Sequence, residues 1–377
     1  MALKISRLEI QQFRALKQLT LDHLGRVNLL TGRNNTGKSS VLEALRILAS
    51  NASPSIIYDI LRFREEDVRE TDDTSEPWDP EGVFQWSSLF HGFPPFSSDL
   101  APIVIKSAGD KATEVSIQGS WLSLERSPVH GRRLVPAQAD FFEESEGIPG
   151  LVVEGGGERR LVPLAGSIRR RTPFGPGIFP PNVANGSRLS CVFIGPYGGE
   201  KTAPLGELWD AIALSDREQH VVEALRIIAP EISAVSMVGG VTPRRARTAI
   251  VRAAGLARPV PLRSFGDGLN RLFGIALSLV SAQDGLLLID EFENGLHHTV
   301  QRDVWRVIFK LARQLDIQVM ATSHSWDAIE AFQEAASESP EEGVLIRLLH
   351  KDAQILPTIF REDELAIVTR ERIEVRG

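Results

Sequence analysis

Cysteine is almost absent from this chain, because Cys191 is the one thiol among 377 residues. A single thiol excludes an internal disulfide framework and a zinc site built from several cysteines, and it fits a reducing compartment. No run of about 18 apolar residues is present, so no membrane-spanning helix is expected. The first residues, MALKISRLEIQQFR, lack the apolar stretch of a signal peptide. We therefore expect a cytoplasmic protein without a membrane partner.

A surplus of basic residues is also missing, since 49 acidic and 42 basic residues give a net charge of −7. This balance argues against a uniformly basic surface that holds nucleic acid through its phosphates. Arginine is concentrated locally, at residues 169–171 and along TPRRARTAIVRAAGLARP, which holds Arg244, Arg245, Arg247, Arg252 and Arg258. Such runs are either solvated faces or local DNA contacts, so DNA stays open as a partner.

Apolar residues at a period of two predict β-strands near the start of the chain. LKISRLEIQQF alternates, and shorter strands follow at LKQLTLD and RVNLL. SSVLEALRILAS has helical spacing and stops at NASPS, where Pro54 disfavours continuation. APIVIKSAG, ATEVSIQGSWLSL, LVVEGG and RRLVPLA alternate between Gly or Asp turns, which predicts an antiparallel meander. The segment 64–82 is rich in acidic residues and the segment 126–190 is rich in glycine and proline. Both compositions are typical of mobile loops.

The second half of the chain predicts a parallel sheet. A strand at SRLSCVFIG precedes helices at LGELWDAIAL and SDREQHVVEALRIIAP, and Ser215 with Glu218 predicts a capping box for the latter, which ends at Pro230. GLLLIDE and IQVMATSH are apolar runs joined by the helical pattern HHTVQRDVWRVIFKLARQL. Strand, helix and strand with continuous apolar runs indicate parallel strands buried on both faces.

A phosphate-binding motif follows the third predicted strand. GRNNTGKS matches G-x-x-x-x-G-K-[ST] between an apolar strand and a helix N-terminus. Its glycines let backbone N–H groups turn toward an anion, Lys38 reaches the β- and γ-phosphates, and the Ser39 hydroxyl can ligate Mg²⁺. The alternative is an incidental Gly/Asn turn with an exposed lysine. The residues expected to bind nucleotide here are Gly32, Asn34, Asn35, Thr36, Gly37, Lys38, Ser39 and Ser40.

Acidic and imidazole groups end the two later apolar strands. LLLIDE delivers Asp290 to the carboxyl end of its strand, where it can hold the Mg²⁺ that Ser39 also holds. Glu291 is then a candidate to orient or deprotonate the attacking water. IQVMATSH ends in His324, which can donate to a γ-phosphate. The alternatives are a strand-terminal acidic turn and a structural histidine.

These motifs, in this order, resemble ABC-type ATPases of the SMC, RecF and OLD kind. GRNNTGKS and LLLIDE resemble the Walker A and Walker B motifs of these ATPases, and SFGDG opens a helix ahead of LLLIDE. ENGLHH is in the place of the D-loop, and ATSH is in the place of the His switch. ISRLEIQQFRAL resembles the first strand of RecF-like proteins, with Arg14 in the position of a nucleotide-contacting arginine. The resemblance covers residues 1–50 and 260–330 well and the middle poorly.

The resemblance implies an α/β fold, an ABC-ATPase head with an N-terminal mixed β-lobe and a C-terminal parallel-sheet αβ lobe. Residues 1–63 and 261–377 would form the two parts of the head. Residues 64–190 would be an inserted β meander, and residues 191–260 a connector of helices and strands. The sequence has no long heptad segment, so no coiled coil is expected.

The resemblance also implies an ATPase with ATP and Mg²⁺ as cofactors and with low turnover that depends on a homodimer. The start of the SFGDG helix would complete the nucleotide site of the partner through Ser264, Gly266 or Gly268. Because SFGDG is looser than the usual signature, the choice among these three stays open. The Mg²⁺-sensing glutamine stays open between Gln85 and Gln118.

Compact ATPases of the OLD-like group are often paired with a Toprim nuclease or another effector in antiviral defence. We therefore expect an ATP-driven dimerising switch that controls a nucleic-acid-acting or defence effector. Two alternatives remain, namely a RecF-like DNA-repair ATPase and a non-hydrolysing, ATP-dependent assembly scaffold for a partner.

Other residues that could carry chemistry have simpler interpretations. His297 and His298 are adjacent, and neighbouring residues on a helix point about 100° apart, so they do not form an i, i+4 metal pair. We expect D-loop or helix-start packing for them and a buried, inert thiol for Cys191. Core or interface packing, rather than base stacking, is expected for the tryptophans at helical positions, Trp209, Trp305 and Trp326.

Overall fold

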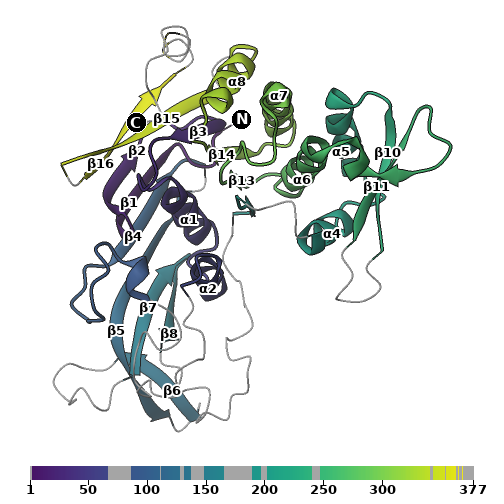
Figure 1. Ribbon diagram of the computed structural model, residues 1–377. Coiled ribbons are helices and arrows are strands. Elements are labelled where there is room, and N and C mark those ends of the chain that lie inside the picture. Colours follow the sequence, from purple (N-terminus) through teal and green to yellow (C-terminus); the bar gives the residue numbers. More distant parts are fainter. Residues whose placement is uncertain are drawn as a thin grey trace.

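The computed structural model describes most of the chain (Figure 1). Its described ranges are 2–66, 86–110, 112–127, 131–136, 148–164, 189–196, 202–239, 247–339, 343–352 and 354–361, with Glu364 and Ile367. Most of the two predicted loops lies outside these ranges, and so do Gln85, residues 169–171 and residues 244–245.

One large antiparallel sheet holds seven strands from the first half of the chain. It runs β2-β1-β4-β5-β7-β8, and β6 pairs with β5. All of its pairs are antiparallel. Its strands are β1 (Arg7–Phe13), β2 (Leu16–Leu21), β4 (Ile103–Ala108), β5 (Glu114–Ser127), β6 (Gly131–Pro136), β7 (Ile148–Gly155) and β8 (Glu158–Pro163).

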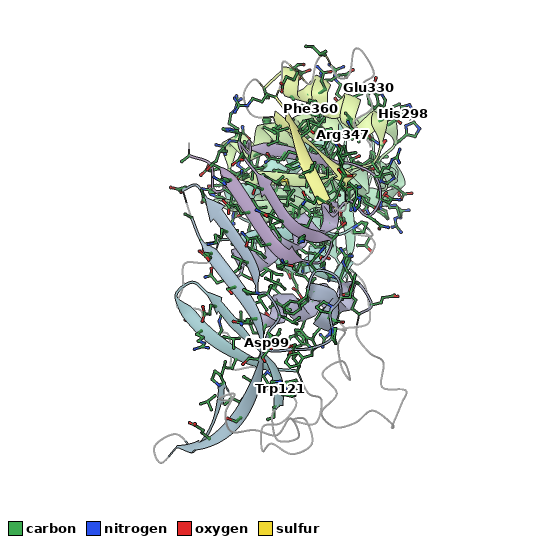
Figure 2. All side chains as sticks on the ribbon, turned by 90° about the vertical axis from the view of Figure 1, so that its left-hand side faces the viewer. Asp99, Trp121, His298, Glu330, Arg347 and Phe360 are labelled. Carbon is green, nitrogen blue, oxygen red and sulfur yellow. The ribbon has the colours of Figure 1, made fainter. Side chains whose placement is uncertain are left out.

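The predicted meander is confirmed, but it is not a separate sheet, because β4 pairs directly with β1. The sheet therefore runs through the expected boundary at residue 63. It is also antiparallel throughout its described pairs, where a mixed lobe was expected. In Figure 2, Trp121 of β5 lies near one end of the antiparallel sheet, far from Arg347 of the second sheet.

The second sheet contains the predicted parallel strands. Its order is β16-β15-β3-β14-β13-β9, and every pair is parallel except β15 with β16. Parallel pairing brings the carboxyl ends of β3, β13 and β14 to one edge, as expected for an open α/β sheet. The strands are β3 (Val27–Thr31), β9 (Cys191–Ile194), β13 (Leu286–Ile289), β14 (Gln318–Thr322), β15 (Gly343–Lys351) and β16 (Gln354–Phe360).

Seven α-helices are described, together with a third, small sheet. The longest of them, α7, has 17 residues, and no described helix is long and apolar enough to cross a membrane. The helices are α1 (Lys38–Ala49), α2 (Pro54–Phe63), α4 (Thr202–Asp210), α5 (Asp216–Ile228), α6 (Asp267–Ser281), α7 (His298–Gln314) and α8 (Trp326–Ser337). Two 3₁₀ turns, Trp86–Leu89 and Leu262–Phe265, and the strands β10 (Ile232–Val238), β11 (Thr248–Ala253) and β12 (Val260–Pro261) complete the list.

Among the features that were not predicted are helix α2 and the β10–β12 sheet. Pro54 disfavours the continuation of α1, but it also occupies the first turn of α2, where a missing N–H costs nothing. In β10 and β11 buried and exposed residues alternate, so the signal was present within the segment expected to connect the lobes. Figure 1 shows this small sheet at the side of the molecule away from β1 and β4.

The parallel sheet separates two hydrophobic cores. Leu29 of β3 packs in the core with helices α5 to α8, whereas its neighbour Leu30 packs in the core with α1, α2 and the antiparallel sheet. Successive side chains of a strand point to opposite faces, so these consecutive leucines serve different cores. Trp209 and Trp305 are buried in the first core and Trp326 packs against it, which confirms the packing predicted for them.

The N-terminal segment is tied to the amino edge of the parallel sheet. Asp316 accepts from Lys4 at 2.5 Å and from Arg26 at 3.0 Å. The Gln318 amide pairs with the backbone of Ile5, accepting its N–H at 2.8 Å and donating to its carbonyl at 2.7 Å. These polar contacts join the two sheets at the edge opposite to the phosphate-binding motif.

The predicted capping box of α5 does not form as expected. Ser215 is the N-cap residue, but its hydroxyl donates to the Ile212 carbonyl at 2.5 Å and caps no helical N–H. The Glu218 carboxylate accepts from the N–H of Leu214 at 3.0 Å, one residue before the expected position. The preceding turn has Leu214 at φ 62°, and this bend presents the Leu214 N–H in place of the Ser215 N–H.

Candidate nucleotide site

The phosphate-binding motif forms a loop between β3 and α1. Gly32 and Gly37 have φ values of 142° and 83°, and Asn35 has 64°, so the loop uses the left-handed conformations that glycine and asparagine tolerate. Lys38 folds over the loop and donates to the carbonyls of Gly32 at 2.7 Å and Arg33 at 2.9 Å. Burial lowers the pKa of Lys38, against the opposing effect of nearby carboxylates.

Two neighbouring hairpins fix the shape of this loop. A Cβ atom at Gly32 would lie 2.5 Å from the carbonyl oxygen of Leu348 on β15. A Cβ atom at Gly37 would lie 2.7 Å from the Leu16 side chain on β2 and 3.4 Å from Ile355 on β16. Side chains are therefore excluded at both glycines by close backbone and core contacts, as well as by conformation.

Asp290 lies at the centre of the site, directly after β13. It is 5% exposed, and its Oδ1 accepts from the Ser39 hydroxyl at 3.1 Å and from the Thr322 hydroxyl at 2.6 Å. Three elements thus converge on one carboxylate oxygen, namely α1, β13 and β14. The structure brings together Ser39 and Asp290, the two residues that the sequence predicted as metal ligands.

Glu291 follows in a strained conformation with φ 51°. Its N–H donates to the Thr322 hydroxyl at 2.9 Å, and its Oε2 accepts from the Asn294 amide at 2.5 Å. The next residue, Phe292, is fully buried and stacks on Trp305 with ring centroids 4.0 Å apart. This aromatic anchor fixes the turn that presents Glu291 and Glu293 on either side of it.

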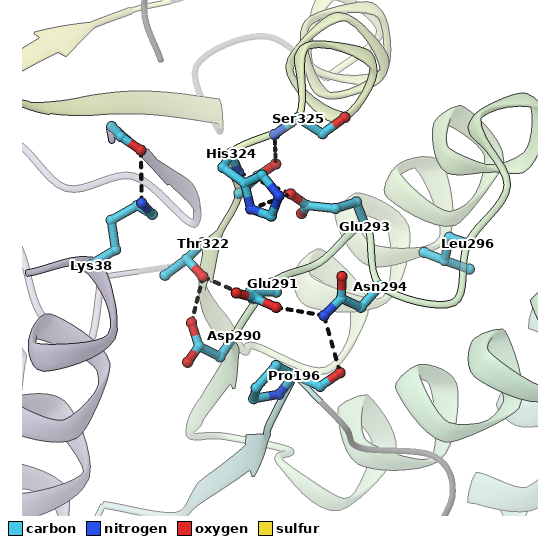
Figure 3. Close-up of polar contacts among 12 residues, drawn as sticks. Lys38, Pro196, Asp290, Glu291, Glu293, Asn294, Leu296, Thr322, His324 and Ser325 are labelled. Carbon is cyan, nitrogen blue, oxygen red and sulfur yellow. Dashed lines mark hydrogen bonds and ion pairs between the residues drawn. The ribbon is translucent and has the colours of Figure 1, made fainter. Parts of the chain in front are cut away.

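His324 lies beyond the end of β14, and its ring is half exposed. Glu293 Oε1 lies 3.1 Å from His324 Nδ1 and accepts the His324 backbone N–H at 2.9 Å (Figure 3). Sequence reasoning missed Glu293 and Asn294 as site residues. Their signal was their position in the ENGLHH segment, two and three residues after Glu291.

The predicted signature residues lie on the other face of the parallel sheet from α1. Helix α6 packs in the core with α5 and α7, whereas α1 packs in the opposite core. Ser264 and Gly266 are exposed just before α6 begins, and no atom lies within 4 Å of a Cβ built at Gly266. Gly268 is half-buried. The structure therefore does not bring these three residues to the phosphate loop of their own chain.

Arg14 is directed at carboxylates rather than at the phosphate loop. Its buried guanidinium lies 2.6 Å from Glu43 of α1 and 2.8 Å from Glu66, and it donates to the Ser88 carbonyl at 3.3 Å. A nucleotide contact for Arg14 stays a prediction. Gln118 is exposed on β5, next to Ile117 in the core, so it points away from α1.

The two adjacent histidines act at the start of α7. His297 is the N-cap residue, and its Nδ1 accepts the N–H of Thr299 at 3.4 Å. The ring centroids of His297 and His298 lie 4.2 Å apart. Within the described residues no group of three or more His, Cys, Asp or Glu side chains could hold a metal ion. Cys191 is half-buried where a buried thiol was expected, and desolvation raises the pKa of its thiol to about 12.

Two family models match the parts of the chain that build this site. A model described as an AAA ATPase domain matches residues 3–79, which include the phosphate loop. A model whose description names an AAA domain, AbiEii toxin and Type IV TA system matches residues 205–329, which include Asp290 and His324.

Two curated proteins are similar to this chain in sequence. An ATP/GTP phosphatase of Helicobacter pylori is 22% identical across an alignment of 386 positions that covers 96% of each chain. An uncharacterized protein of Methanocaldococcus jannaschii is 41% identical over 59 residues, 15% of this chain and 27% of that protein.

Solved structures match the fold over almost its whole length. An Smc head bound to the C-terminal winged-helix domain of ScpA has a TM-score of 0.51 at 12% identity, over 95% of this chain and 98% of that one. An Smc head with an extended coiled coil, bound to the C-terminal domain of ScpA derived from Pyrococcus furiosus, has a TM-score of 0.50 at 11% identity. That match covers 99% of this chain and 100% of the other. The α/β head fold predicted from the motifs is confirmed.

Proposed function

We propose that this chain, which has the fold of an SMC head, is an ABC-type ATPase that hydrolyses ATP only between two copies of itself. In this proposal each nucleotide lies between the phosphate loop of one copy and the start of α6 of the other. ATP then holds the two heads together, and hydrolysis releases them. The protein is a dimerising switch.

The observation that carries this proposal is the exposed start of α6. A helix N-terminus with free N–H groups favours an anion, and Gly266 leaves open space in front of it. This position lies across the parallel sheet from the phosphate loop of the same chain. A second copy, related by a twofold axis, would use it to complete each of two identical sites.

The oxygen ligands around Asp290 suit Mg²⁺. The Ser39 hydroxyl and the Asp290 carboxylate are hard oxygen donors that already meet at 3.1 Å, and they would hold the ion together with nucleotide phosphates. When bound, Mg²⁺ would offset negative charge on the β- and γ-phosphates. Lys38 would exchange its contacts with the Gly32 and Arg33 carbonyls for contacts with these phosphates.

Glu291 and His324 would act on the attacking water and the γ-phosphate. Glu291 accepts a hydrogen bond at Oε2, which leaves Oε1 free to accept a proton from a water. The ring of His324 is half exposed at the same sheet edge and can donate to a phosphate oxygen. The roles of both residues depend on bound nucleotide.

The first experiment combines two inactive variants. Lys38→Ala removes the lysine that would contact phosphate in a copy's own phosphate loop. Ser264→Arg, made in a separate copy, blocks the start of α6 that would complete the partner's site. Each variant alone should release phosphate from ATP at least about 100-fold more slowly than the wild type. A mixture of the two should regain part of the activity, because one site of the mixed dimer is intact. Full activity of Ser264→Arg alone, or a mixture no more active than its two separate components, would contradict the shared site.

Glu291→Gln provides the second test. We expect ATP-dependent dimers, seen as a doubled mass by light scattering, with hydrolysis lowered at least about 100-fold. Wild-type protein that binds ATP and dimerises but never hydrolyses it would favour the scaffold interpretation. Hydrolysis stimulated by duplex DNA in a salt-dependent manner would favour the DNA-repair interpretation.

A second function, control of a defence effector, is favoured by the family description that names AbiEii toxin and Type IV TA system. We infer that the ATP-driven cycle of the dimer gates an effector that acts on nucleic acid, such as a Toprim nuclease encoded nearby. Cells that carry this chain with its neighbouring genes should reduce phage plating, and Lys38→Ala should abolish the effect. Equal plating with and without the intact operon would contradict it.

A further inference from the structure

Two consecutive residues, Glu293 and Asn294, each contact one of the two groups assigned to the reaction. We propose that this pair positions His324 and Glu291 for hydrolysis, with Glu293 orienting the imidazole and Asn294 orienting the carboxylate. The proposal rests on the proposed function and adds two residues to its site. Neither residue would touch the reacting atoms, so both are positioning residues.

Glu293 holds the imidazole of His324 at one nitrogen. Its Oε1 lies 3.1 Å from Nδ1 and also accepts the His324 backbone N–H at 2.9 Å. Two contacts from one oxygen fix both the ring and the backbone that carries it. Since Nδ1 is engaged, Nε2 is the ring nitrogen that remains for a phosphate oxygen. The Glu293 side chain is only 10% exposed, whereas that of His324 is 52% exposed.

The other oxygen of Glu293 argues for a functional role. Glu293 Oε2 is buried and accepts no hydrogen bond from any described residue. A carboxylate kept for stability would use both oxygens, because an unpaired buried acceptor is unfavourable. Buried groups that are incompletely satisfied occur preferentially where a site demands them. Replacing Glu293 should therefore affect activity more than folding.

Asn294 holds Glu291 by a bridge. Its amide nitrogen donates to Glu291 Oε2 at 2.5 Å and to the Pro196 carbonyl at 3.3 Å. An amide NH₂ has two protons, so one group can serve both acceptors. Pro196 follows β9, the strand next to β13, and this second contact fixes the direction of the amide. Figure 3 shows Asn294 between Glu291 and Pro196, with Glu293 turned toward His324.

The backbone explains how neighbouring residues reach opposite targets. The Asn294 N–H donates to the Glu291 carbonyl at 3.1 Å, and the Leu296 N–H donates to the Glu293 carbonyl at 3.0 Å, which makes two successive turns. The buried ring of Phe292 anchors the first turn. The side chains of Glu293 and Asn294 leave this turn in different directions.

The decisive experiment is a double-mutant cycle on ATP hydrolysis by the full chain. Glu293→Leu should lower kcat about 10- to 100-fold, as loss of an orienting partner does elsewhere, while KM for ATP changes less than about threefold. In a His324→Ala background, Glu293→Leu should have no further effect, because the ring it orients is absent. Glu293→Gln keeps a neutral acceptor and should give an intermediate kcat. This conservative variant still tests the proposal if the leucine variant fails to fold.

Asn294→Leu should lower kcat to a similar extent, with ATP-dependent dimer formation retained. The matched control is Glu334→Leu on α8, which removes an exposed carboxylate from a surface ion pair with Arg302 of α7. This variant should leave kcat unchanged. Wild-type kcat in Glu293→Leu and Glu293→Gln, or equal losses with and without His324, would overturn the role of Glu293. Wild-type kcat in Asn294→Leu would overturn that of Asn294. If Glu291→Gln itself hydrolyses ATP normally, the proposed function fails instead.

Discussion

Thr322 and Asp290 are joined by a hydrogen bond of 2.6 Å between hydroxyl and carboxylate, at the adjacent ends of β14 and β13. The same hydroxyl oxygen accepts the Glu291 N–H at 2.9 Å. One threonine side chain thus sets the position of the predicted metal ligand and of the backbone that carries the predicted base. Thr322 is fully buried, so water does not compete for these contacts.

Thr322→Val should impair the site with little change in shape. Valine fills the same volume but removes the donor to Asp290 and the acceptor for the Glu291 N–H, so stability should fall by about 1–3 kcal/mol. Turnover should fall about 10- to 100-fold, because Asp290 and Glu291 lose their common support. Denaturant titration and phosphate release measure the two effects. Thr322→Ser keeps both contacts, and an equally inactive serine variant would contradict this explanation.

Gly37→Ala should disrupt the phosphate loop for two separate reasons. The left-handed φ of 83° costs a residue with a Cβ atom about 1–2 kcal/mol, and that atom would lie 2.7 Å from Leu16. We expect ATP affinity, measured by calorimetry, to fall more than about tenfold. Gly157→Ala is the matched control, since Gly157 has φ 78° but no atom within 4 Å of a Cβ. ATP binding equal to that of the wild type in Gly37→Ala would contradict the prediction.

Arg14→Met should act mainly on stability. The guanidinium pairs with Glu43 and Glu66 in a buried network, and its removal leaves carboxylates short of a partner, at a cost of about 3–5 kcal/mol. Arg7→Met is the control, because Arg7 is half exposed in its pairs with Glu9 and Asp22 and should cost little. Thermal unfolding and ATP calorimetry should be measured together. Weaker ATP binding with unchanged stability would instead support the nucleotide contact predicted for Arg14.

Asp316→Asn should change the acid sensitivity of the fold. Burial alone would raise the pKa of Asp316, but hydrogen bonds and positive charge from Lys4 and Arg26 lower it below its ordinary value. The carboxylate therefore stabilises the protein above its unfolded pKa of about 4, and this stabilisation is lost as the pH falls through the lowered folded value. At pH 7 the variant should be about 1–3 kcal/mol less stable.

The difference between wild type and Asp316→Asn should shrink as the pH falls below about 4, which denaturant titration at several pH values would detect. Asp303→Asn is the control, because its ion pair with Arg306 is exposed and should contribute at most about 0.5 kcal/mol. A difference that stays constant from pH 7 to pH 3 would show that charge on Asp316 is not involved.

Local motifs sufficed to predict the elements that carry the site. LLLIDE and IQVMATSH each combine an apolar strand with the polar residues at its end, and GRNNTGKS directly follows the apolar strand RVNLL. Strand, turn and side-chain chemistry could therefore be predicted from neighbouring residues. Helix α2 was missed because Pro54 has opposite meanings inside a helix and in its first turn. The capping box of α5 failed because its geometry depends on the preceding turn at Leu214.

The sequence by itself determined the phosphate loop, the acidic strand end and the parallel strands, because each depends on contacts within a few residues or on a repeating pattern of apolar side chains. Only the tertiary structure decided that the meander continues the sheet of β1, since strand partners far apart in the chain leave no local signal. It also decided that Arg14 pairs with Glu43 and that the start of α6 lies across the sheet from the phosphate loop. The directions of Glu293 and Asn294 were likewise set by distant partners, His324 and Pro196, because a side chain's partner depends on which strands lie side by side.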